Sequence, residues 1–251
     1  MKKLIIQIPC WNEAETIRET ILSLPTNVAG FDSVEFLVID DGSKDETVAE
    51  AKRAGAHYVL SLFEHEGLAA AFETGVHYAF GLGASVVVNT DADNQYCARD
   101  IENLVQPILK KEADLVIGDR NASKLSYLPL WKQFLYRVAE QIVSFLARQK
   151  IPDPTSGFRA MSRMLIGEIK ITDEYSYTIE TLIQALFSGK KVVFVSVRTN
   201  PVRRPSRLIN NMAFYILKTT RALVRSYFRY AIKPKLLPKF APTRAGLEEQ
   251  A

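Results

Sequence analysis

Short apolar runs alternate with helical stretches through the first half of the chain, and this alternation constrains the fold more than any other feature. The runs are rich in β-branched residues and too short for buried helices. Strands that alternate with helices indicate a mostly parallel α/β sheet, which binds ligands at the carboxyl ends of its strands. The expected strands are 4–8, 34–40, 58–61, 85–90 and 114–118. The expected helices are 13–23, capped by Asn12, a second helix that starts at Ser43 or Asp45 and ends near 54, then 67–80 and 99–111.

The second half contains longer elements. Its pattern predicts helices over 129–149 and 177–187, a turn-rich loop over 151–157, and a strand over 191–197 that joins the same sheet. Prolines at 234, 238 and 242 interrupt the end of the chain. We therefore expect a catalytic domain over 1–207, an amphipathic helix over 208–232 and a mobile tail over 233–251.

Composition favours a protein of a reducing compartment. The chain has 251 residues, is 47% hydrophobic and contains two cysteines, which make no disulfide framework. It shows neither the apolar stretch of a signal peptide nor a run of about 18 apolar residues that would cross a membrane. We expect a cytoplasmic protein.

Charge is distributed unevenly along the chain. The net charge is +4, yet residues 181–247 contain fourteen Lys and Arg and no Asp or Glu. Such a stretch indicates a polyanionic neighbour, and a solvated basic face is the alternative.

The segment Asp91-Ala92-Asp93-Asn94-Gln95 follows an apolar strand and is the strongest chemical signal. Alternate residues of an extended chain point to one side, so Asp91, Asp93 and the Gln95 amide could converge on one cation. Mg²⁺ and Mn²⁺ prefer such oxygen ligands together with phosphate oxygens. The alternative is a turn with aspartates that cap a helix.

A second acidic pair, Asp40-Asp41-Gly42-Ser43, also ends a strand. Acids at this position accept hydrogen bonds from ribose hydroxyls or a base edge. Ser43 with Glu46 also fits a capping box, and both interpretations can hold together.

The order of these pieces resembles glycosyltransferase family 2, which has the GT-A fold. Further segments resemble the dolichyl-phosphate mannose synthase branch, and the match covers about 3–210. The segments are Ile8-Pro9-Cys10-Trp11-Asn12-Glu13, Ile39-Asp40-Asp41-Gly42-Ser43, Gly67-Leu68-Ala69, Asp91-Ala92-Asp93-Asn94-Gln95, Gly118-Asp119-Arg120, Asp153-Pro154-Thr155-Ser156-Gly157-Phe158-Arg159 and Arg203-Arg204-Pro205-Ser206-Arg207.

The resemblance implies a role for each matched residue and an inverting transfer. Residues that would hold the nucleoside are Pro9, Trp11, Glu13, Ile39 and Asp41. Residues that would hold Mg²⁺ or Mn²⁺ and the diphosphate are Asp91, Asp93 and Gln95. Residues that would bind the acceptor phosphate are Arg120, Lys132, Ser156, Arg203, Arg204 and Arg207. Of these, the residues implied to be catalytic are Asp93, Arg120, Arg203 and Arg207. The chain departs from the pattern at His65-Glu66-Gly67, at Lys132 and Tyr136, and at Arg207, which replaces lysine.

The cations argue for a phosphate acceptor. A hydroxyl acceptor needs a carboxylate base, whereas a phosphate monoester is ionised near pH 7, with a second pKa of about 6. Arg120, Arg159 and the arginines at 203–207 suit phosphate binding, and scattered surface cations are the alternative. Asp153 and Glu180 are candidate bases or partners for these arginines.

The helix over 208–232 has two different sides. Lys218, Arg221, Arg225 and Arg229 lie on one side, and an apolar, aromatic-rich side lies opposite. This pattern suits the headgroup layer of an anionic membrane, which predicts peripheral association with the cytoplasmic face. A helix packed on the catalytic domain, or docking of a membrane-spanning partner protein, are the alternatives.

Together these features predict a metal-dependent inverting glycosyltransferase that moves a hexose from GDP-mannose or a UDP-sugar to dolichyl or undecaprenyl phosphate. One alternative is a family 2 transferase that acts on a hydroxyl of a soluble acceptor. Another is a non-catalytic, membrane-bound module that binds nucleotide sugars. Nucleic acid is not expected as a partner, because the aromatic residues of the basic stretch do not lie among its cations.

Overall fold

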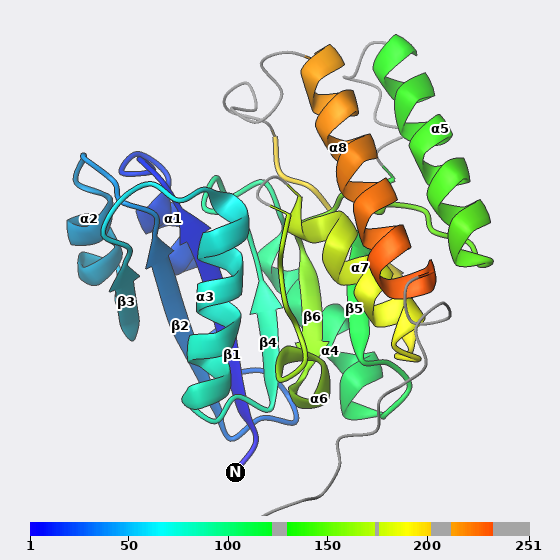
Figure 1. Ribbon diagram of the computed structural model, residues 1–251. Helices are drawn as coiled ribbons and strands as arrows, with labels where there is room; N and C mark the ends of the chain where they lie inside the picture. The colour runs from blue at the N-terminus through cyan, green and yellow to red at the C-terminus, as the bar shows by residue number, and fades with distance from the viewer. Residues whose placement is uncertain (122–129, 174–175, 202–211, 233–251) are drawn as a thin grey trace, which may run out of the picture.

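A seven-stranded sheet forms the centre of the structure, which is a computed structural model that describes residues 1–121, 130–173, 176–201 and 212–232. The strand order is β3-β2-β1-β4-β6-β5-β7 (Figure 1). Neighbouring strands are parallel except for β6, which is antiparallel to β4 and β5. The predicted α/β class is confirmed. The strands are β1 Lys3–Cys10, β2 Ser33–Asp40, β3 Tyr58–Ser61, β4 Val86–Asn89, β5 Leu115–Asp119, β6 Arg159–Ser162 and β7 Val192–Ser196.

Helices cover both faces of this sheet. They are α1 Ile17–Ser23, α2 Thr47–Arg53, α3 Leu68–Gly81, α4 Ile101–Leu109, α5 Leu130–Ala147, α6 Arg163–Ile166, α7 Tyr177–Phe187 and α8 Met212–Tyr227. A 3-10 turn, Ala98–Asp100, precedes α4, and a π-helical turn, Phe228–Ile232, follows α8.

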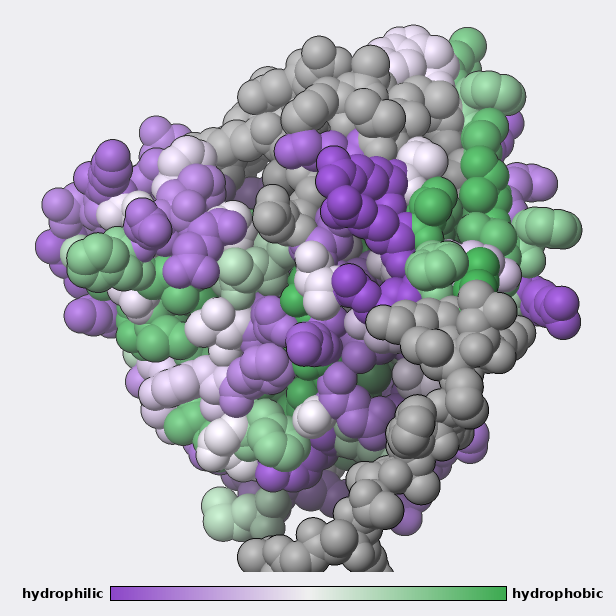
Figure 2. Space-filling view, viewed as in Figure 1, coloured by the Kyte–Doolittle hydropathy of each residue, from purple (hydrophilic) through white to green (hydrophobic). Residues whose placement is uncertain are grey.

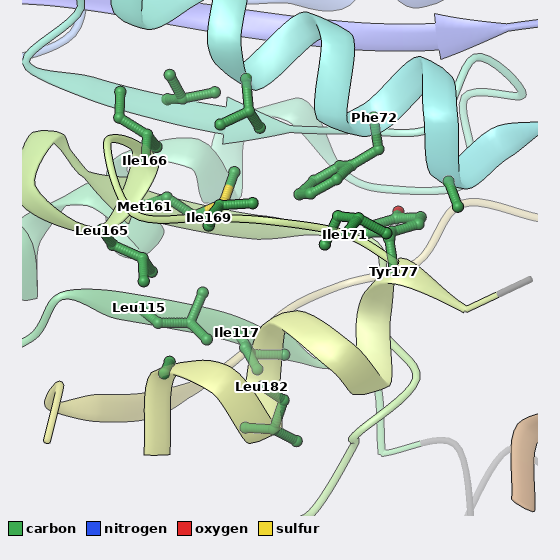
Figure 3. Packing of buried hydrophobic residues seen from close by; sticks show 14 of the residues in the cluster. Phe72, Leu115, Ile117, Met161, Leu165, Ile166, Ile169, Ile171, Tyr177 and Leu182 are labelled. Atoms are coloured by element: carbon green, nitrogen blue, oxygen red, sulfur yellow. The ribbon is translucent and has the colours of Figure 1, made fainter. Parts of the chain in front are cut away.

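The alternation of side chains along each strand divides the core into two clusters. On β1, Ile5 points into a cluster shared with α3 and α7, whereas Leu4 and Ile6 point into one shared with α1 and α4. Figure 3 shows the first cluster, in which Phe72 of α3 and Tyr177 of α7 stack with ring centroids 4.0 Å apart. The inner strands β1, β4 and β5 are therefore buried on both faces, which explains their continuous apolar runs.

One strand was not predicted. β6 has only four residues, begins with an arginine and contains no β-branched residue, so its sequence carries no strand signal. Its place between β4 and β5 brings the preceding loop, 151–158, to the carboxyl edge of the sheet, because an antiparallel strand starts where its neighbours end.

Two predicted helix starts are wrong. α1 begins at Ile17, and Asn12 instead adopts a positive φ of 52° and accepts a hydrogen bond from the Lys44 N–H. The capping box at Ser43 does not form, because the Ser43 hydroxyl accepts from the Asn12 N–H at 2.8 Å. Asn12 and Ser43 therefore connect the loops after β1 and β2 instead of capping the starts of helices.

α8 packs against α7 through its apolar side. Leu223 is buried, and the ring of Tyr227 meets that of Phe187 edge to face, 5.4 Å between centroids. Of the described helices, none combines the length and the apolar character that a membrane span requires. The apolar side of α8 therefore packs on the rest of the catalytic domain, which was the alternative to contact with a membrane. Arg221, Arg225 and Arg229 are exposed.

Candidate active site

The loops after β1 and β2 form one hydrogen-bonded unit at the carboxyl edge. The Glu13 N–H donates to the Thr47 hydroxyl at 2.7 Å, and the Ala14 N–H donates to Asp45 at 3.2 Å. Trp11 projects from this unit with 38% of its surface exposed. Of the predicted nucleoside contacts, Ile39 is wholly buried in the core and Pro9 is buried within β1, so neither offers its side chain to a ligand.

The acidic loop after β4 is held in place by α1. The Thr20 hydroxyl donates to the Ala92 carbonyl at 2.8 Å, and the Asn94 amide donates to Glu19 at 3.1 Å. Asp93 accepts the N–H of Gln95 at 3.1 Å, which closes a tight turn. The predicted ligand segment therefore has a defined backbone before any ligand binds.

Asp91 lies at the inner side of this loop, against the segment that leads into β6. A Cβ placed on Gly157 would lie 2.9 Å from both Asp91 Oδ1 and the Tyr177 hydroxyl, so a larger residue there would displace one of these two groups. Burial, and secondly the neighbouring Asp93, raise the pKa of Asp91 from 3.8 to about 7. The two carboxylates repel each other, which is unfavourable for the pair alone and suits a shared cation.

The donor set fits a divalent ion that also binds phosphate. Asp91 and Asp93 supply carboxylates and Gln95 an amide, which leaves positions for other ligands. Within the part of the chain that the structure describes, no group of three or more His, Cys, Asp or Glu side chains could hold a metal. A diphosphate would have to complete the coordination of the ion, as expected for a nucleotide-bound metal.

A buried polar network joins the acidic loop to the loop before β6. Asn89 donates to the Gly157 carbonyl at 2.8 Å and to the Tyr177 hydroxyl at 3.2 Å, and the Gly157 N–H donates to the Tyr96 hydroxyl at 3.1 Å. Gln7 in turn donates to Asn89 at 2.9 Å. No motif in the sequence predicts these residues as part of the site. Gln7 and Asn89 are nevertheless polar interruptions in buried apolar strands, and such interruptions indicate a buried polar network.

Two residues that were placed near the acceptor are buried. Arg159 is completely buried and donates to the carbonyls of Ser156 and Thr178, at 3.1 and 3.0 Å. Ser156 is also completely buried. Both therefore shape the loop before β6 from within, and in this conformation neither side chain can reach an acceptor.

Arg120, at the end of β5, is held by a carboxylate. Its Nε and Nη2 donate to the two oxygens of Asp153 at 2.8 and 2.9 Å, and Nη2 also donates to the Thr155 hydroxyl at 3.2 Å. Asp153 is 1% exposed and the Arg120 side chain 20%. Arg120 also acts on Asp91, whose pKa it lowers against the larger effect of burial. Arg120 thus has a fixed position beside the acidic loop.

Glu180 has a structural role. It is buried, accepts the N–H groups of Thr172 and Asp173 at 2.8 Å each, and pairs with Arg229 at 3.1 Å. The two carboxylates that were considered as bases, Asp153 and Glu180, are therefore both partners of arginines.

The segment before the predicted acceptor arginines borders the acidic loop. The Asn200 N–H donates to the Gln95 carbonyl at 2.7 Å, its side chain donates to the Asn94 carbonyl at 2.8 Å, and Arg198 pairs with Asp100 at 2.7 Å. Arg203, Arg204 and Arg207 themselves, and the tail 233–251, lie outside the described residues, as does the side chain of Lys132 on α5.

α5 carries an exposed apolar stripe that was not predicted from the sequence. Its members share one face of the helix, within about 80° of arc at 100° per residue. They are Trp131, Phe134, Val138, Ile142 and Phe145. Figure 2 shows this hydrophobic band over α5 beside a strongly hydrophilic patch over α8. We call these five residues the α5 stripe.

Comparison with known proteins agrees with this architecture. The model of the family described as Glycosyl transferase family 2 matches residues 5–170. The chain is 28% identical over 210 residues to UDP-N-acetylglucosamine--dolichyl-phosphate N-acetylglucosaminyltransferase of Methanococcus voltae, covering 76% of this chain and 81% of that protein. It is 28% identical over 211 residues to polyprenol monophosphomannose synthase of Mycolicibacterium smegmatis, covering 78% and 77%.

Solved structures support the same fold. Glucosyl-3-phosphoglycerate synthase of Mycobacterium tuberculosis, in complex with Mn²⁺, UDP and glucosyl-3-phosphoglycerate, superposes with a TM-score of 0.65 at 21% identity, covering 91% of this chain and 80% of that one. A complex of that enzyme with Mg²⁺ and UDP gives a TM-score of 0.64 at 21% identity, covering 89% and 80%. The chain therefore belongs to glycosyl transferase family 2 and is a glycosyltransferase with the GT-A fold.

Proposed function

We propose that the chain transfers a hexose from a nucleotide-diphosphate sugar, GDP-mannose or a UDP-sugar, to a polyprenyl phosphate with inversion. This proposal is supported mainly by the ion pairs of Asp153 and Glu180. Both carboxylates are buried, and they pair with Arg120 and Arg229 respectively. Neither is placed to remove a proton from a hydroxyl acceptor. A phosphate acceptor requires no such base.

The transfer is a single displacement. An ionised oxygen of the acceptor phosphate forms a bond to the anomeric carbon, while the bond from that carbon to the donor diphosphate breaks and its electrons leave with the nucleoside diphosphate. Arg120 attracts the acceptor phosphate toward the acidic loop, and we assign the same role to Lys132, Arg203, Arg204 and Arg207. These cations offset the repulsion between two anionic substrates.

Asp91, Asp93 and Gln95 would hold Mg²⁺ or Mn²⁺, which neutralises charge on the departing diphosphate. The raised pKa of Asp91 supports this role, because a bound cation would remove the repulsion between the two carboxylates. The solved complexes of the related fold contain Mn²⁺ or Mg²⁺ together with UDP.

We further propose that the protein associates peripherally with the cytoplasmic face of a membrane through the α5 stripe. Five large apolar side chains on one helix face are unusual for a solvated surface. Exposed cations accompany them: Arg137 on α5, Arg148 directly after α5, and Arg221 and Arg225 on α8. Both helices contribute to the same hydrophobic cluster. An apolar stripe flanked by cations fits an anionic lipid surface, from which a polyprenyl phosphate would reach the site.

The test of the proposed function is transfer of label. Purified protein is incubated with Mg²⁺ or Mn²⁺, a panel of radiolabelled sugar nucleotides, and either polyprenyl phosphate or 3-phosphoglycerate. We expect label that is extractable into organic solvent and depends on both the lipid phosphate and the metal. Water-soluble product from 3-phosphoglycerate alone would overturn the lipid acceptor, and absence of metal dependence would overturn the role of the acidic loop.

A further inference from the structure

The segment after β7 crosses the carboxyl edge of the sheet and pairs with the acidic loop. β7 is an edge strand, and β4, from which the acidic loop extends, lies three strands away from it. Thr199 nevertheless forms an antiparallel bridge with Tyr96, and the Cys97 N–H donates to the Arg198 carbonyl at 3.2 Å. We call residues 198–200 the crossing segment.

A buried carboxylate anchors the crossing segment. Asp100, in the 3-10 turn before α4, is 2% exposed. It accepts the main-chain N–H of Arg198 at 2.7 Å and binds the guanidinium of the same residue, also at 2.7 Å. The crossing segment is therefore held in place by a residue outside the acidic loop.

The last residue of the crossing segment, Asn200, binds three successive carbonyls of the acidic loop. Its side-chain amide has two N–H donors, and it donates to the Asn94 carbonyl at 2.8 Å and to the Tyr96 carbonyl at 3.3 Å. Its main-chain N–H donates to the carbonyl between them, that of Gln95, at 2.7 Å. Asn94 has a φ of 57°, a left-handed conformation that asparagine adopts more readily than most residues.

These bonds fix the two peptide groups on either side of the Gln95 Cα. The preceding peptide is held at both ends, because its carbonyl accepts from Asn200 and its N–H donates to Asp93 at 3.1 Å. The following peptide is held through the Gln95 carbonyl by the main-chain N–H of Asn200. A peptide group is planar, so the orientation of these two planes determines the direction in which the Gln95 side chain leaves the backbone.

We propose that Asn200 is a positioning residue for Gln95, one of the three proposed metal ligands. Asn200 acts through the main chain of the acidic loop and is not itself a ligand. Residues that orient metal ligands contribute strongly to metal affinity, and their loss typically weakens it by about 10–100-fold. This inference rests on the proposed function, because it presupposes that Gln95 binds the ion.

The experiment measures how much a metal strengthens nucleotide binding. Calorimetric titration gives the affinity of UDP and of GDP for the full-length protein, once with Mn²⁺ and once with EDTA, and the ratio of the two values is the metal enhancement. Electron paramagnetic resonance of free Mn²⁺ in the same samples reports the bound ion directly. Neither measurement depends on sugar transfer.

Asn200→Ala removes the side-chain amide and keeps the main-chain N–H. We expect the metal enhancement to fall about tenfold, while the affinity in EDTA stays the same. Asn200→Asp keeps the shape of the side chain but offers no N–H to the carbonyls, so the same fall is expected. A melting curve for each variant verifies that it is folded.

Gln184→Ala is the matched control. The Gln184 side chain, which is 7% exposed, donates to the Glu168 carbonyl at 2.9 Å and accepts the Lys170 N–H at 3.3 Å. Like Asn200, it therefore binds the main chain through an amide, but it lies about 10 Å along α7 from Tyr177. Gln184→Ala should lower the melting temperature and leave the metal enhancement unchanged.

The outcomes separate the two proposals. An unchanged metal enhancement in both Asn200 variants would overturn the role of Asn200, and so would an equal fall in Gln184→Ala or an equal weakening with EDTA. If Mn²⁺ does not strengthen nucleotide binding even in the wild-type protein, the proposed role of the acidic loop fails, and the role of Asn200 fails with it.

Discussion

Replacement of Asp91 by asparagine should stabilise the metal-free protein and abolish its activity. Burial and Asp93 raise the pKa of Asp91 from 3.8 to about 7. Each pKa unit corresponds to 1.36 kcal/mol, and the two carboxylates titrate together, so ionised Asp91 destabilises the folded state by roughly 2–4 kcal/mol. We expect Asp91→Asn to raise the free energy of unfolding by about this amount at pH 8 in EDTA.

The pH dependence follows from the direction of this shift. The pKa of Asp91 in the folded state, about 7, lies above its value in the unfolded chain, so the folded state binds more protons between about pH 4 and pH 7. The contribution of Asp91 to stability therefore falls as the pH rises through this window and stays low above it. Mg²⁺ or Mn²⁺ should restore stability to wild-type protein at pH 8 and have little effect at pH 5.

Urea denaturation at pH 5 and pH 8, with EDTA or with Mn²⁺, measures these differences, and sugar transfer is assayed on the same samples. Glu112→Gln, at an exposed carboxylate, is the matched control and should leave the pH dependence unchanged. Equal stability of wild-type and Asp91→Asn protein at pH 8 in EDTA would refute the reasoning, because the carboxylate would then carry no penalty.

Three further predictions concern the acceptor side. Asp153→Asn should raise the KM for polyprenyl phosphate, because Asp153 positions Arg120. The fall of the transfer rate at low pH should remain in this variant. Loss of that fall would identify Asp153 as a base. Phe134→Ser combined with Phe145→Ser should weaken binding to anionic vesicles about 100-fold, because about 2 kcal/mol for each buried phenylalanine, scaled by exposures of 64% and 83%, gives about 3 kcal/mol. The control is Leu22→Ser, at an exposed leucine outside the α5 stripe, which should bind vesicles like wild type in a sedimentation assay. If the wild-type protein forms dimers and the double variant does not, the α5 stripe is instead a self-association surface. Arg207→Ala should weaken use of the lipid acceptor and spare donor binding; transfer at the wild-type rate would remove Arg207 from the acceptor site.

The sequence was sufficient for most of the sheet, because the inner strands β1, β4 and β5 are buried on both faces and therefore stand out as apolar runs. It was insufficient for β6, whose four residues gain their conformation from β4 and β5 on either side. The helix starts failed for a related reason. Asn12 and Ser43 carry capping signals, yet they bond to each other's loops, which are 31 residues apart in the chain.

The site could be located from the sequence, but the partners of its charges could not. The position of Asp91 after a buried strand was enough to place the acidic loop. The pairing of Arg120, which follows β5, with Asp153, which precedes β6, depends on the reversed direction of β6. The α5 stripe escaped notice because helical periodicity predicts a buried face as readily as an exposed one. Only the packing shows that Phe134 and Phe145 face outward.

The reversal of β6 gives this enzyme a modular construction. The chain leaves the sheet after β5 and re-enters it at β6 from the same edge, so the whole excursion between them, with α5, is an insertion whose two ends are neighbours. Its length and composition can change without shifting the register of the other strands. The segment that we propose to meet the acceptor and the membrane can therefore diverge, while the loops after β1, β2 and β4 that we propose to hold the donor stay the same.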